Sequence, residues 1–513
     1  MSDIRVRRSG LVSFAIRLGS TITGLAFVVI VTSNLSPNDF GLWQLISRIV
    51  AYMVLVSVIL GFWTTRYRAR GMIIGRTVVA GALILSVFLT VIYFLISPLA
   101  ANSVPRADTV ASNLYYFLLS MPQIPLYVTV STVEAILWGS QPTKASLGFG
   151  LFEIAKVAIA FVTVSILHLT LTGAILAVMG AQVVQLTTSC ILARKDFRDR
   201  ISLSLISTMF RNGWVAILNS LQPLVLNSDL VIVAAIAASL LPVAIFGAAY
   251  TLASVISYSG TIASGLYAGL LSGRDPRHST MQVLELQYLF LFPMTAGEIV
   301  LATPLMHLLN KSYAIGGSIL IVLAISQALY SISQTFDNVI SGTDRIDAEG
   351  KASFSAYLKS KIFLVSKINL LIGLGYLAAV AIIASAFNGA PEDILGYSRY
   401  VLLGICWAFA ALAMFAIIVA LKVREVLKVS NLSIPGKTVL ALLASTAVFS
   451  AVLFGLVNFA YYPSGGEISQ ALSILALGMI ALVAYFACIF ALSNNFRRLA
   501  KLTVNSIQES IFS

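Results

Sequence analysis

Apolar stretches of about twenty residues follow one another along almost the whole of this chain. A helix needs about 20 mainly apolar residues to cross the hydrocarbon core of a bilayer. By that rule the sequence predicts fourteen membrane-spanning helices, at residues 10–34, 42–62, 77–98, 112–139, 146–167, 170–193, 209–237, 241–272, 281–308, 316–340, 361–386, 397–421, 437–459 and 467–492. Hydrophobic residues make up 59% of the chain and charged residues only 10%, against about 25% charged residues in soluble proteins. We therefore expect an all-α polytopic membrane protein.

The positive charges alternate along the chain with the predicted helices. If the N-terminus is cytoplasmic and charged residues at the ends of the spans are counted with the adjoining loops, 26 of the 33 Lys and Arg residues fall in segments on the cytoplasmic side. The outer loops then hold Arg106, Lys311 and Arg399, and the helices hold Arg17, Arg48, Lys156 and Lys367. Such a bias indicates membrane orientation, so we expect both termini in the cytoplasm. The longest loop, residues 341–360, is too short for a catalytic domain, so the function must reside in the helix bundle.

The totals and motifs exclude several other classes of function. The net charge of +13 lies mainly in these loops, so it reports orientation and gives no reason to expect a nucleic-acid partner. The three cysteines lie in apolar stretches without CxxC spacing, which argues against a disulfide framework or a zinc site. The nucleotide-binding motif GxxxxGKS/T does not occur, so this chain is not expected to hydrolyse ATP. We predict a protein that is not an enzyme and has no cofactor.

Polar residues form stripes on five of the predicted helices. They recur at the spacing of one helical face in the first, second, seventh, eighth and tenth helices. The members are Ser13, Ser20 and Thr21 with Arg17; Gln44 with Arg48; Asn219 and Asn227; Thr251, Ser254 and Tyr258; and Gln327 with Gln334. Small and hydroxylated residues can also serve helix packing alone. Because there are five stripes, and two carry arginine, we expect them to line a shared polar cavity.

Ionisable residues inside the predicted helices are candidate functional residues, because a charge at the bilayer centre costs about 2.5–3.5 kcal/mol on insertion scales. Arg17 and Arg48 would lie at two heights along one cavity wall. Lys156 follows Glu153 by three residues, a spacing that also fits an ion pair on one helix face. The second half of the chain supplies three acids, Asp229, Glu298 and Asp337, as candidate ion sites.

One short motif gives the chain a family resemblance. Residues 35–45 read LSPNDFGLWQL, a leucine and an acidic turn followed by Phe-Gly and an aromatic residue. The matching positions are Leu35, Asp39, Phe40, Gly41 and Trp43. This segment resembles the signature region of polysaccharide and lipid-linked oligosaccharide exporters. These exporters belong to the multidrug/oligosaccharidyl-lipid/polysaccharide (MOP) flippase superfamily.

A fainter echo of this motif occurs at the start of the predicted eighth helix, where Phe246 and Gly247 are followed by Tyr250. Asp229 also matches an aspartate that the family commonly carries in its seventh helix. The resemblance implies two six-helix lobes, residues 1–200 and 201–433, followed by two further helices and a tail, residues 434–513. It also implies a V-shaped arrangement with a central cavity, lined by helices one, two, seven and eight, that opens alternately to each side.

The resemblance further implies a transporter that flips a lipid-linked oligosaccharide, a polyprenyl-phosphate or polyprenyl-diphosphate glycan, to the outer leaflet. Arginine forms charge-assisted, often bidentate bonds to phosphate, so Arg17 and Arg48, with Lys156, are the expected phosphate contacts. The polar stripes would hold sugar hydroxyls. Coupling to H⁺ or Na⁺ at one of the three acids is an open alternative. We expect a monomer in a prokaryotic plasma membrane.

Two other functions stay open at this point. A drug or organic-cation antiporter of the same superfamily would need an acidic pocket, which the second half of the chain could supply. The arginines of the first half argue against it. A membrane-embedded glycosyltransferase or polymerase would need an acidic catalytic cluster at an interface loop, whereas the outer loops hold only scattered acids.

Overall fold

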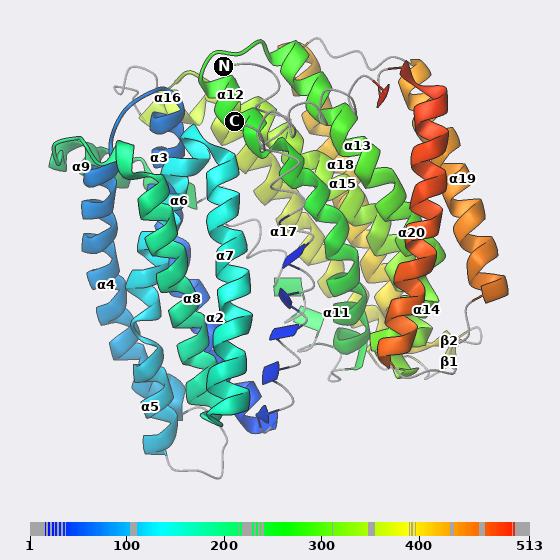
Figure 1. Cartoon of the computed structure of the whole chain (residues 1–513), viewed down its shortest axis with the longest axis horizontal. Coiled ribbons are helices and arrows are strands. Elements are labelled where there is room, and N and C mark those ends of the chain that lie inside the picture. The colour runs from blue at the N-terminus through cyan, green and yellow to red at the C-terminus, as the bar shows by residue number, and fades with distance from the viewer. Residues whose placement is uncertain are drawn as a thin grey trace.

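Long helices run side by side through the computed structural model of this chain (Figure 1). The structure describes residues 37–102, 110–214, 241–309, 311–346, 354–388, 397–430, 436–460 and 467–494. It also describes shorter runs and single positions at 16, 19–20, 23–24, 26–27, 30–31, 34–35, 216–217, 228–229, 232–233, 236, 390, 393–394 and 496–497.

The first part of the chain forms the helices on the left of Figure 1. They are α2 (Pro37–Val54), the 3₁₀ segment η1 (Leu55–Ser57), α3 (Val58–Ala69), α4 (Gly75–Asn102), α5 (Val110–Ser120), α6 (Gln123–Ser140), α7 (Pro142–Ala160), the π-helical segment η2 (Phe161–Ile166), α8 (Thr170–Leu192), η3 (Arg194–Asp196) and α9 (Leu203–Arg211). We call α2–α9 the N-lobe.

The second part forms the helices in the middle and on the right of Figure 1. They are α11 (Leu241–Ala253), the 3₁₀ segment η4 (Ser254–Ala263), α12 (Ser264–Leu271), α13 (Pro276–Val300), α14 (Ala302–Leu309), η5 (Lys311–Gly316), α15 (Gly317–Gly342), α16 (Phe354–Leu358), α17 (Lys361–Phe387), α18 (Arg399–Ser430), α19 (Gly436–Ala460) and α20 (Glu467–Leu492). The short antiparallel pair β1 (Asp393–Ile394) and β2 (Tyr397–Ser398) precedes α18. We call α11–α20 the C-lobe.

Eleven helices in the described part of the chain are long and apolar enough to cross a membrane, and each overlaps a predicted span. The spans predicted at 10–34 and 209–237 lie largely outside the described residues. The span predicted at 112–139 is divided into α5 and α6 by a turn at Met121 and Pro122. The all-α membrane fold is confirmed, whereas the count of fourteen stays a prediction.

The apolar cores of the N-lobe and the C-lobe are largely separate. One core contains Trp63 and Tyr93 and comes almost wholly from the N-lobe. Two others, around Trp407 and around Tyr485, come from the C-lobe. The last two long helices, α19 and α20, pack against each other, and α19 packs against α13 at the edge of the C-lobe. The predicted boundaries after residues 200 and 433 stay predictions, because the cores do not fix them to a residue.

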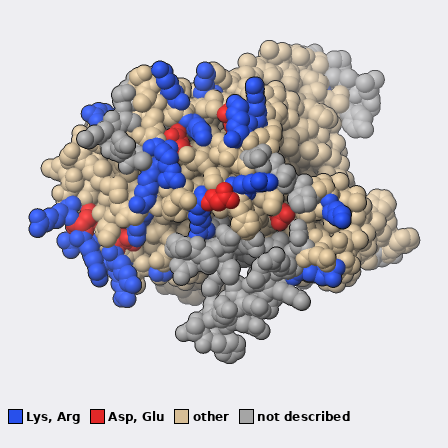
Figure 2. All heavy atoms as spheres, turned by 90° about the horizontal axis from the view of Figure 1, so that it is seen from above, with Lys and Arg blue, Asp and Glu red and all other residues tan. Residues whose placement is uncertain are grey.

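Lys and Arg side chains gather on the face of the molecule that Figure 2 views from above. In Figure 1 this is the upper end, where α3 ends and where α9, α12 and α16 lie. Local caps begin helices here: the Asp275 carboxylate accepts from the backbone N–H groups of Arg277 and His278, and Ser360 caps α17. We call this end the basic face, and the positive-inside rule predicts that it is cytoplasmic.

Arg66 of α3 and Arg70, which directly follows this helix, join the lobes at the basic face. Arg66 is fully buried, and its guanidinium donates to the backbone oxygens of Ser341 at 2.8 Å and Asp344 at 2.9 Å and to the Tyr267 hydroxyl at 3.1 Å. Arg70 donates to the same Asp344 oxygen at 3.0 Å. The last carbonyls of a helix have no partner inside the helix, and a cation near them is favoured by the helix dipole. We call this contact between α3 and the end of α15 the arginine latch.

Spans two and eight are each interrupted by a 3₁₀ segment, η1 in the former and η4 in the latter. Ten residues is long for such a segment, and a 3₁₀ stretch inside a helix often marks a hinge. Gly260 of η4 lies so close to α15 that a Cβ atom there would come within 2.6 Å of the Gln334 side-chain oxygen. Beyond these segments, α3 and α12 contact each other at the basic face.

We expect Arg66→Ala to loosen the contact between the lobes at the basic face. The substitution removes hydrogen bonds from a charged donor, each of which contributes about 1.5–3 kcal/mol. Spin labels at Lys195→Cys in the N-lobe and Arg277→Cys in the C-lobe, in a chain whose native cysteines are replaced, report the separation by pulsed electron paramagnetic resonance. The distance distribution should become longer and broader.

Arg68→Ala is the matched control for this experiment. Arg68 lies two residues after Arg66 in the last turn of α3. It pairs with Asp196 of the N-lobe at 2.6 Å and makes no described contact across the lobes. Its removal should leave the distance distribution unchanged. If Arg66→Ala behaved like Arg68→Ala, apolar packing would hold the lobes together without the arginine latch.

Candidate functional site

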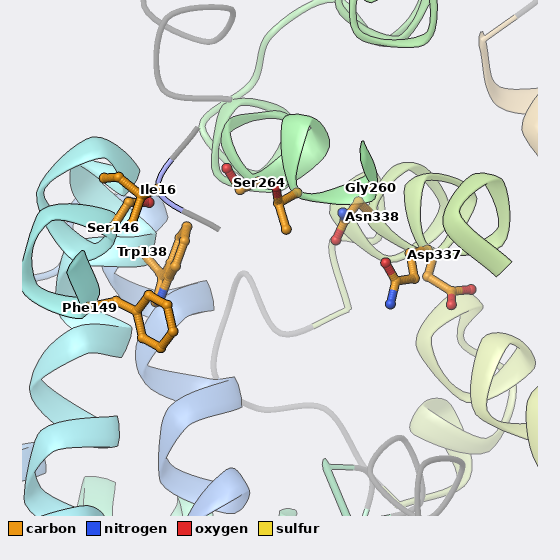
Figure 3. Close-up of a pocket in the computed structure, with 10 residues that line it drawn as sticks. Ile16, Trp138, Ser146, Phe149, Gly260, Ser264, Asp337 and Asn338 are labelled. Atoms are coloured by element: carbon orange, nitrogen blue, oxygen red, sulfur yellow. The ribbon is translucent and has the colours of Figure 1, made fainter. Parts of the chain in front are cut away.

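A cavity of about 340 Å³ lies between the two lobes, and we call it the central cavity (Figure 3). On the side of the N-lobe it is lined by Ile16, Trp138, Ser146 and Phe149, and on the side of the C-lobe by Gly260, Thr261, Ser264, Gln334, Asp337 and Asn338. Trp138 lies near the end of α6 and Ser146 near the start of α7, so the cavity is close to the basic face. One wall is mainly apolar and aromatic, and the other carries amides and hydroxyls.

Among the described lining residues, Asp337 is the charged one, and it forms an ion pair with Lys422 of α18. The Lys422 ammonium lies 2.6 Å from Asp337 Oδ1 and donates to Ser333 Oγ at 2.7 Å. Asn369 Nδ2 of α17 lies 3.4 Å from Asp337 Oδ2. In Figure 3 the Asp337 carboxylate points away from Trp138 and Phe149 on the opposite wall. The acid is therefore part of an ion pair inside the C-lobe.

A second, much smaller cavity of about 30 Å³ lies within the C-lobe beside Asp229. Asp229 is buried, and its Oδ2 accepts hydrogen bonds from the Tyr376 hydroxyl at 2.5 Å and from Trp407 Nε1 at 3.0 Å. Phe246 stacks on Trp407 with ring centroids 3.6 Å apart, which fixes the indole. Gln327 also lines this cavity. A space of this size holds about one water molecule or one small ion.

Some predicted site residues lie in these cavities and others do not. Gln334 and Asp337 line the central cavity, and Asp229 and Gln327 line the smaller one. The Thr251 and Ser254 hydroxyls instead donate to backbone carbonyls of their own helix, and Tyr258 packs against the C-lobe core. Glu298 lies on α13 and lines neither cavity; its buried Oε2 has no hydrogen-bond partner among the described residues.

Lys156 forms the ion pair that its spacing from Glu153 predicted. Its ammonium lies 2.9 Å and 3.0 Å from the two Glu153 carboxylate oxygens, and it also lies over the rings of Phe27 and Phe152. Thr23 donates to the same carboxylate at 3.1 Å. The charge of Lys156 is thus balanced within this state, and its role toward phosphate stays a prediction.

Several predicted positions cannot be placed. Ser13, Arg17, Thr21, Asn219 and Asn227 lie outside the described residues, and the side chains of Gln44 and Arg48 in α2 do as well. Ser20 is described and half-buried, but it lines neither cavity. Spans one and eight supply described residues to the central cavity, as the resemblance implied, and α6, α7 and α15 also contribute.

Three groups of residues form contacts in the structure that the sequence pattern did not indicate. Arg66 and Lys422 were counted with the loops, because the predicted spans end at 62 and 421, whereas α3 continues to Ala69 and α18 to Ser430. Tyr376 and Trp407 looked like ordinary aromatic residues of apolar helices. Glu134 of α6, which accepts from Gln185 Nε2 at 2.7 Å, could have been found as a carboxylate inside the predicted fourth span.

Comparisons with known proteins extend this description. No family model matches the sequence, and no curated protein matches it. A solved structure of a MATE protein in the straight conformation aligns with a TM-score of 0.64 over 84% of this chain and 98% of its own, at 15% identity. An outward-facing multidrug resistance MATE family transporter of the MOP superfamily aligns with a TM-score of 0.61 over 84% of this chain and 99% of its own, at 16% identity.

A MOP superfamily transporter from Pyrococcus furiosus gives the same picture, with a TM-score of 0.60 over 83% of this chain and 97% of its own, at 17% identity. In that protein, reverse polarity of the binding pocket suggests a different function. These likenesses agree with the superfamily that residues 35–45 resemble. This chain is a multi-pass membrane protein with the fold of the MATE transporters of the MOP superfamily.

Proposed function

We propose that this chain is a transporter that moves a lipid-linked oligosaccharide from the cytoplasmic to the outer leaflet of the plasma membrane. The two walls of the central cavity carry this proposal. Trp138 and Phe149 offer aromatic faces on one side, and Gln334 and Asn338 offer amides on the other. A sugar has both apolar ring faces and hydroxyl groups, which such walls suit. A volume of about 340 Å³ is at the lower end of small-molecule sites, so it suits the part of the glycan nearest the lipid.

Alternating access is the proposed mode of transport. The arginine latch joins the lobes at the basic face, so this state is one that is closed toward the cytoplasm. Opening requires α3 to leave the end of α15, and the 3₁₀ segments η1 and η4 are the places where spans two and eight can bend. The lipid tail would stay in the bilayer while the headgroup passes through the central cavity.

The phosphate of the headgroup is assigned in this proposal to Arg17 and Arg48. Ile16, the residue before Arg17 in the sequence, lines the central cavity. Arginine binds phosphate oxygens through paired, charge-assisted hydrogen bonds. Lys156 would join them only if an anion displaced Glu153 from its ammonium.

The length of the chain supports an exporter of this branch. The three solved transporter structures described above match over 97–99% of their own length but over only 83–84% of this chain. This chain therefore has residues beyond the shared fold, and we assign them to α19 and α20, which pack against each other at the edge of the C-lobe. The exporters that residues 35–45 resemble have two helices beyond the twelve of the drug-exporting branch.

Asp229 is the proposed site for a coupling proton. The cavity beside it has room for about one water molecule, which could bring a proton to the carboxylate. Trp407 Nε1 can only donate hydrogen bonds, so it cannot be a ligand for Na⁺ at this carboxylate. Asp337 is less suited to carry a proton, because a buried lysine that loses its anionic partner is strongly destabilised.

Reconstitution into liposomes tests the proposed function. We expect the purified chain to move a fluorescent polyprenyl-diphosphate oligosaccharide between leaflets, measured as the fraction accessible to an external quencher. Arg17→Ala and Arg48→Ala should each slow this movement about tenfold or more, because one lost hydrogen bond to a charged group costs about 1.5–3 kcal/mol. Lys367→Ala is the control, since Lys367 is also a cation inside a span but is exposed and lines neither cavity.

The proposal fails if liposomes with the wild-type chain flip this lipid no faster than empty liposomes. Normal rates in both arginine variants would overturn the assignment of the phosphate contacts but not the substrate.

Proton coupling gives a separate prediction. With a more acidic exterior, the wild-type chain should export the lipid-linked oligosaccharide faster than without a pH gradient. Asp229→Asn should abolish the difference between these two rates, because an amide cannot take up the proton. Glu298→Gln should keep the difference, since Glu298 lines neither cavity. If Glu298→Gln abolished the difference and Asp229→Asn kept it, the coupling site would be Glu298.

A second candidate function is an antiporter of organic cations. One observation favours it: the charged residue among the described residues of the central cavity is an acid, Asp337. Whether that acid can attract a cation depends on Lys422.

A further inference from the structure

The charge of Asp337 is paired with that of Lys422, a lysine that a ligand in the central cavity cannot contact. The Lys422 side chain has no exposed surface, whereas a quarter of the Asp337 side chain is exposed. The carboxylate thus separates the ammonium from the cavity. This order of groups, cavity then acid then lysine, joins α15 to α18.

The hydrogen bonds around the pair keep the lysine in place. Its ammonium donates to Ser333 Oγ at 2.7 Å, one helical turn before Asp337 on α15, and it lies 2.6 Å from Asp337 Oδ1. A buried ammonium is stable only with such partners. The pair is therefore a fixed part of the C-lobe wall and not a mobile surface contact.

The pair has no net charge, and this changes what the cavity can hold. A lone carboxylate in a low-dielectric wall would attract an organic cation strongly. With Lys422 directly behind it, a cation at the cavity wall meets an acid and an ammonium whose fields largely cancel. Amides and hydroxyls then dominate that wall, and these suit a neutral sugar.

We propose that Lys422 is a specificity-determining residue, which cancels the charge of Asp337 and so keeps organic cations out of the central cavity. This inference deepens the proposed function and rests on it for the identity of the true substrate. By this inference, the side chain of Lys422 distinguishes the two candidate functions. A purely structural role, in which the pair only ties α15 to α18, is the reading that the experiment must exclude.

The experiment measures binding of the lipophilic cation tetraphenylphosphonium to the full chain in nanodiscs by isothermal titration calorimetry. Lys422→Met and Lys422→Gln both remove the charge, and the glutamine can still bond to Ser333. We expect each to bind the cation at least tenfold more tightly than the wild-type chain. The double variant Lys422→Met/Asp337→Asn should return to the wild-type affinity, because it removes the acid that would attract the cation.

Two controls separate specificity from stability. Lys422→Arg keeps the positive charge and should bind the cation as weakly as the wild-type chain. Lys428→Met removes a lysine from the same helix, where it pairs with Glu425 at 2.6 Å on an exposed surface, and it should also leave cation binding unchanged. A gain that appeared in Lys428→Met as well would point to a general effect of lost positive charge and would overturn the proposal.

Asp337→Asn in the otherwise wild-type chain tests the same inference without altering Lys422. This substitution leaves the Lys422 ammonium without its acid, so the variant should bind the cation no more tightly than the wild-type chain does. Tighter binding of the cation by Asp337→Asn would show that the carboxylate is not the group that attracts cations, and it would overturn the proposal. Equal affinities in the wild-type, Lys422→Met and Lys422→Gln chains would leave the pair a structural tie and would overturn it as well.

These outcomes are independent of the flipping assay. Failure of the wild-type chain to flip the oligosaccharide lipid, together with the expected gain of cation binding in Lys422→Met, would refute the substrate but not the role of Lys422. Normal flipping by the wild-type chain, together with no gain of cation binding in any Lys422 variant, would refute the role of Lys422 but not the substrate.

Discussion

A charge buried inside an apolar bundle needs a fixed partner, and this requirement governs how the helices of this protein meet. Lys422 meets Asp337 between α18 and α15, Lys156 meets Glu153 along α7, and Arg66 meets the carbonyls at the end of α15. A buried charge that loses its partner costs about 3–5 kcal/mol. The Lys422 pair therefore ties two helices of the C-lobe together, whereas the Lys156 pair lies within one helix. The arginine latch joins different lobes, so its contacts must be exchanged for others if the lobes rock.

The location of these contacts divides the molecule into parts that stay together and parts that separate. Within the C-lobe, α15 carries both the ion pair with α18 and the acceptors of the arginine latch. Movement of α15 relative to α3 would therefore carry the wall of the central cavity with it. The 3₁₀ segment η4 borders the same cavity through Gly260 and Thr261. A bend there would change the shape of the cavity at the same time as the contact at the basic face.

The sequence predicted what depends on local pattern and missed what depends on distant contacts. Apolar length and loop charge predicted the all-α membrane fold, and the spacing of Glu153 and Lys156 predicted their pair. Arg66 lies in a helix that extends 7 residues beyond the predicted span, and Lys422 lies in a helix that extends 9 residues beyond it. A charge ends an apolar stretch in the sequence, but a partner on another helix lets the span continue past it. The sequence pattern of one helix does not identify a partner on another helix, so the arginine latch and the Lys422 pair could be found only from the structure.

The two aspartates of the C-lobe show how the same side chain acquires different properties from its neighbours. Asp337 forms an ion pair with the Lys422 ammonium, which in our proposal cancels the attraction of Asp337 for cations. Asp229 accepts hydrogen bonds from a phenol and an indole, which orient the carboxylate but carry no charge of their own. The first environment fits a wall that must be neutral toward a sugar. The second fits a group that changes its protonation during a cycle, because neither Tyr376 nor Trp407 has to give up an ionic partner when the carboxylate takes up a proton.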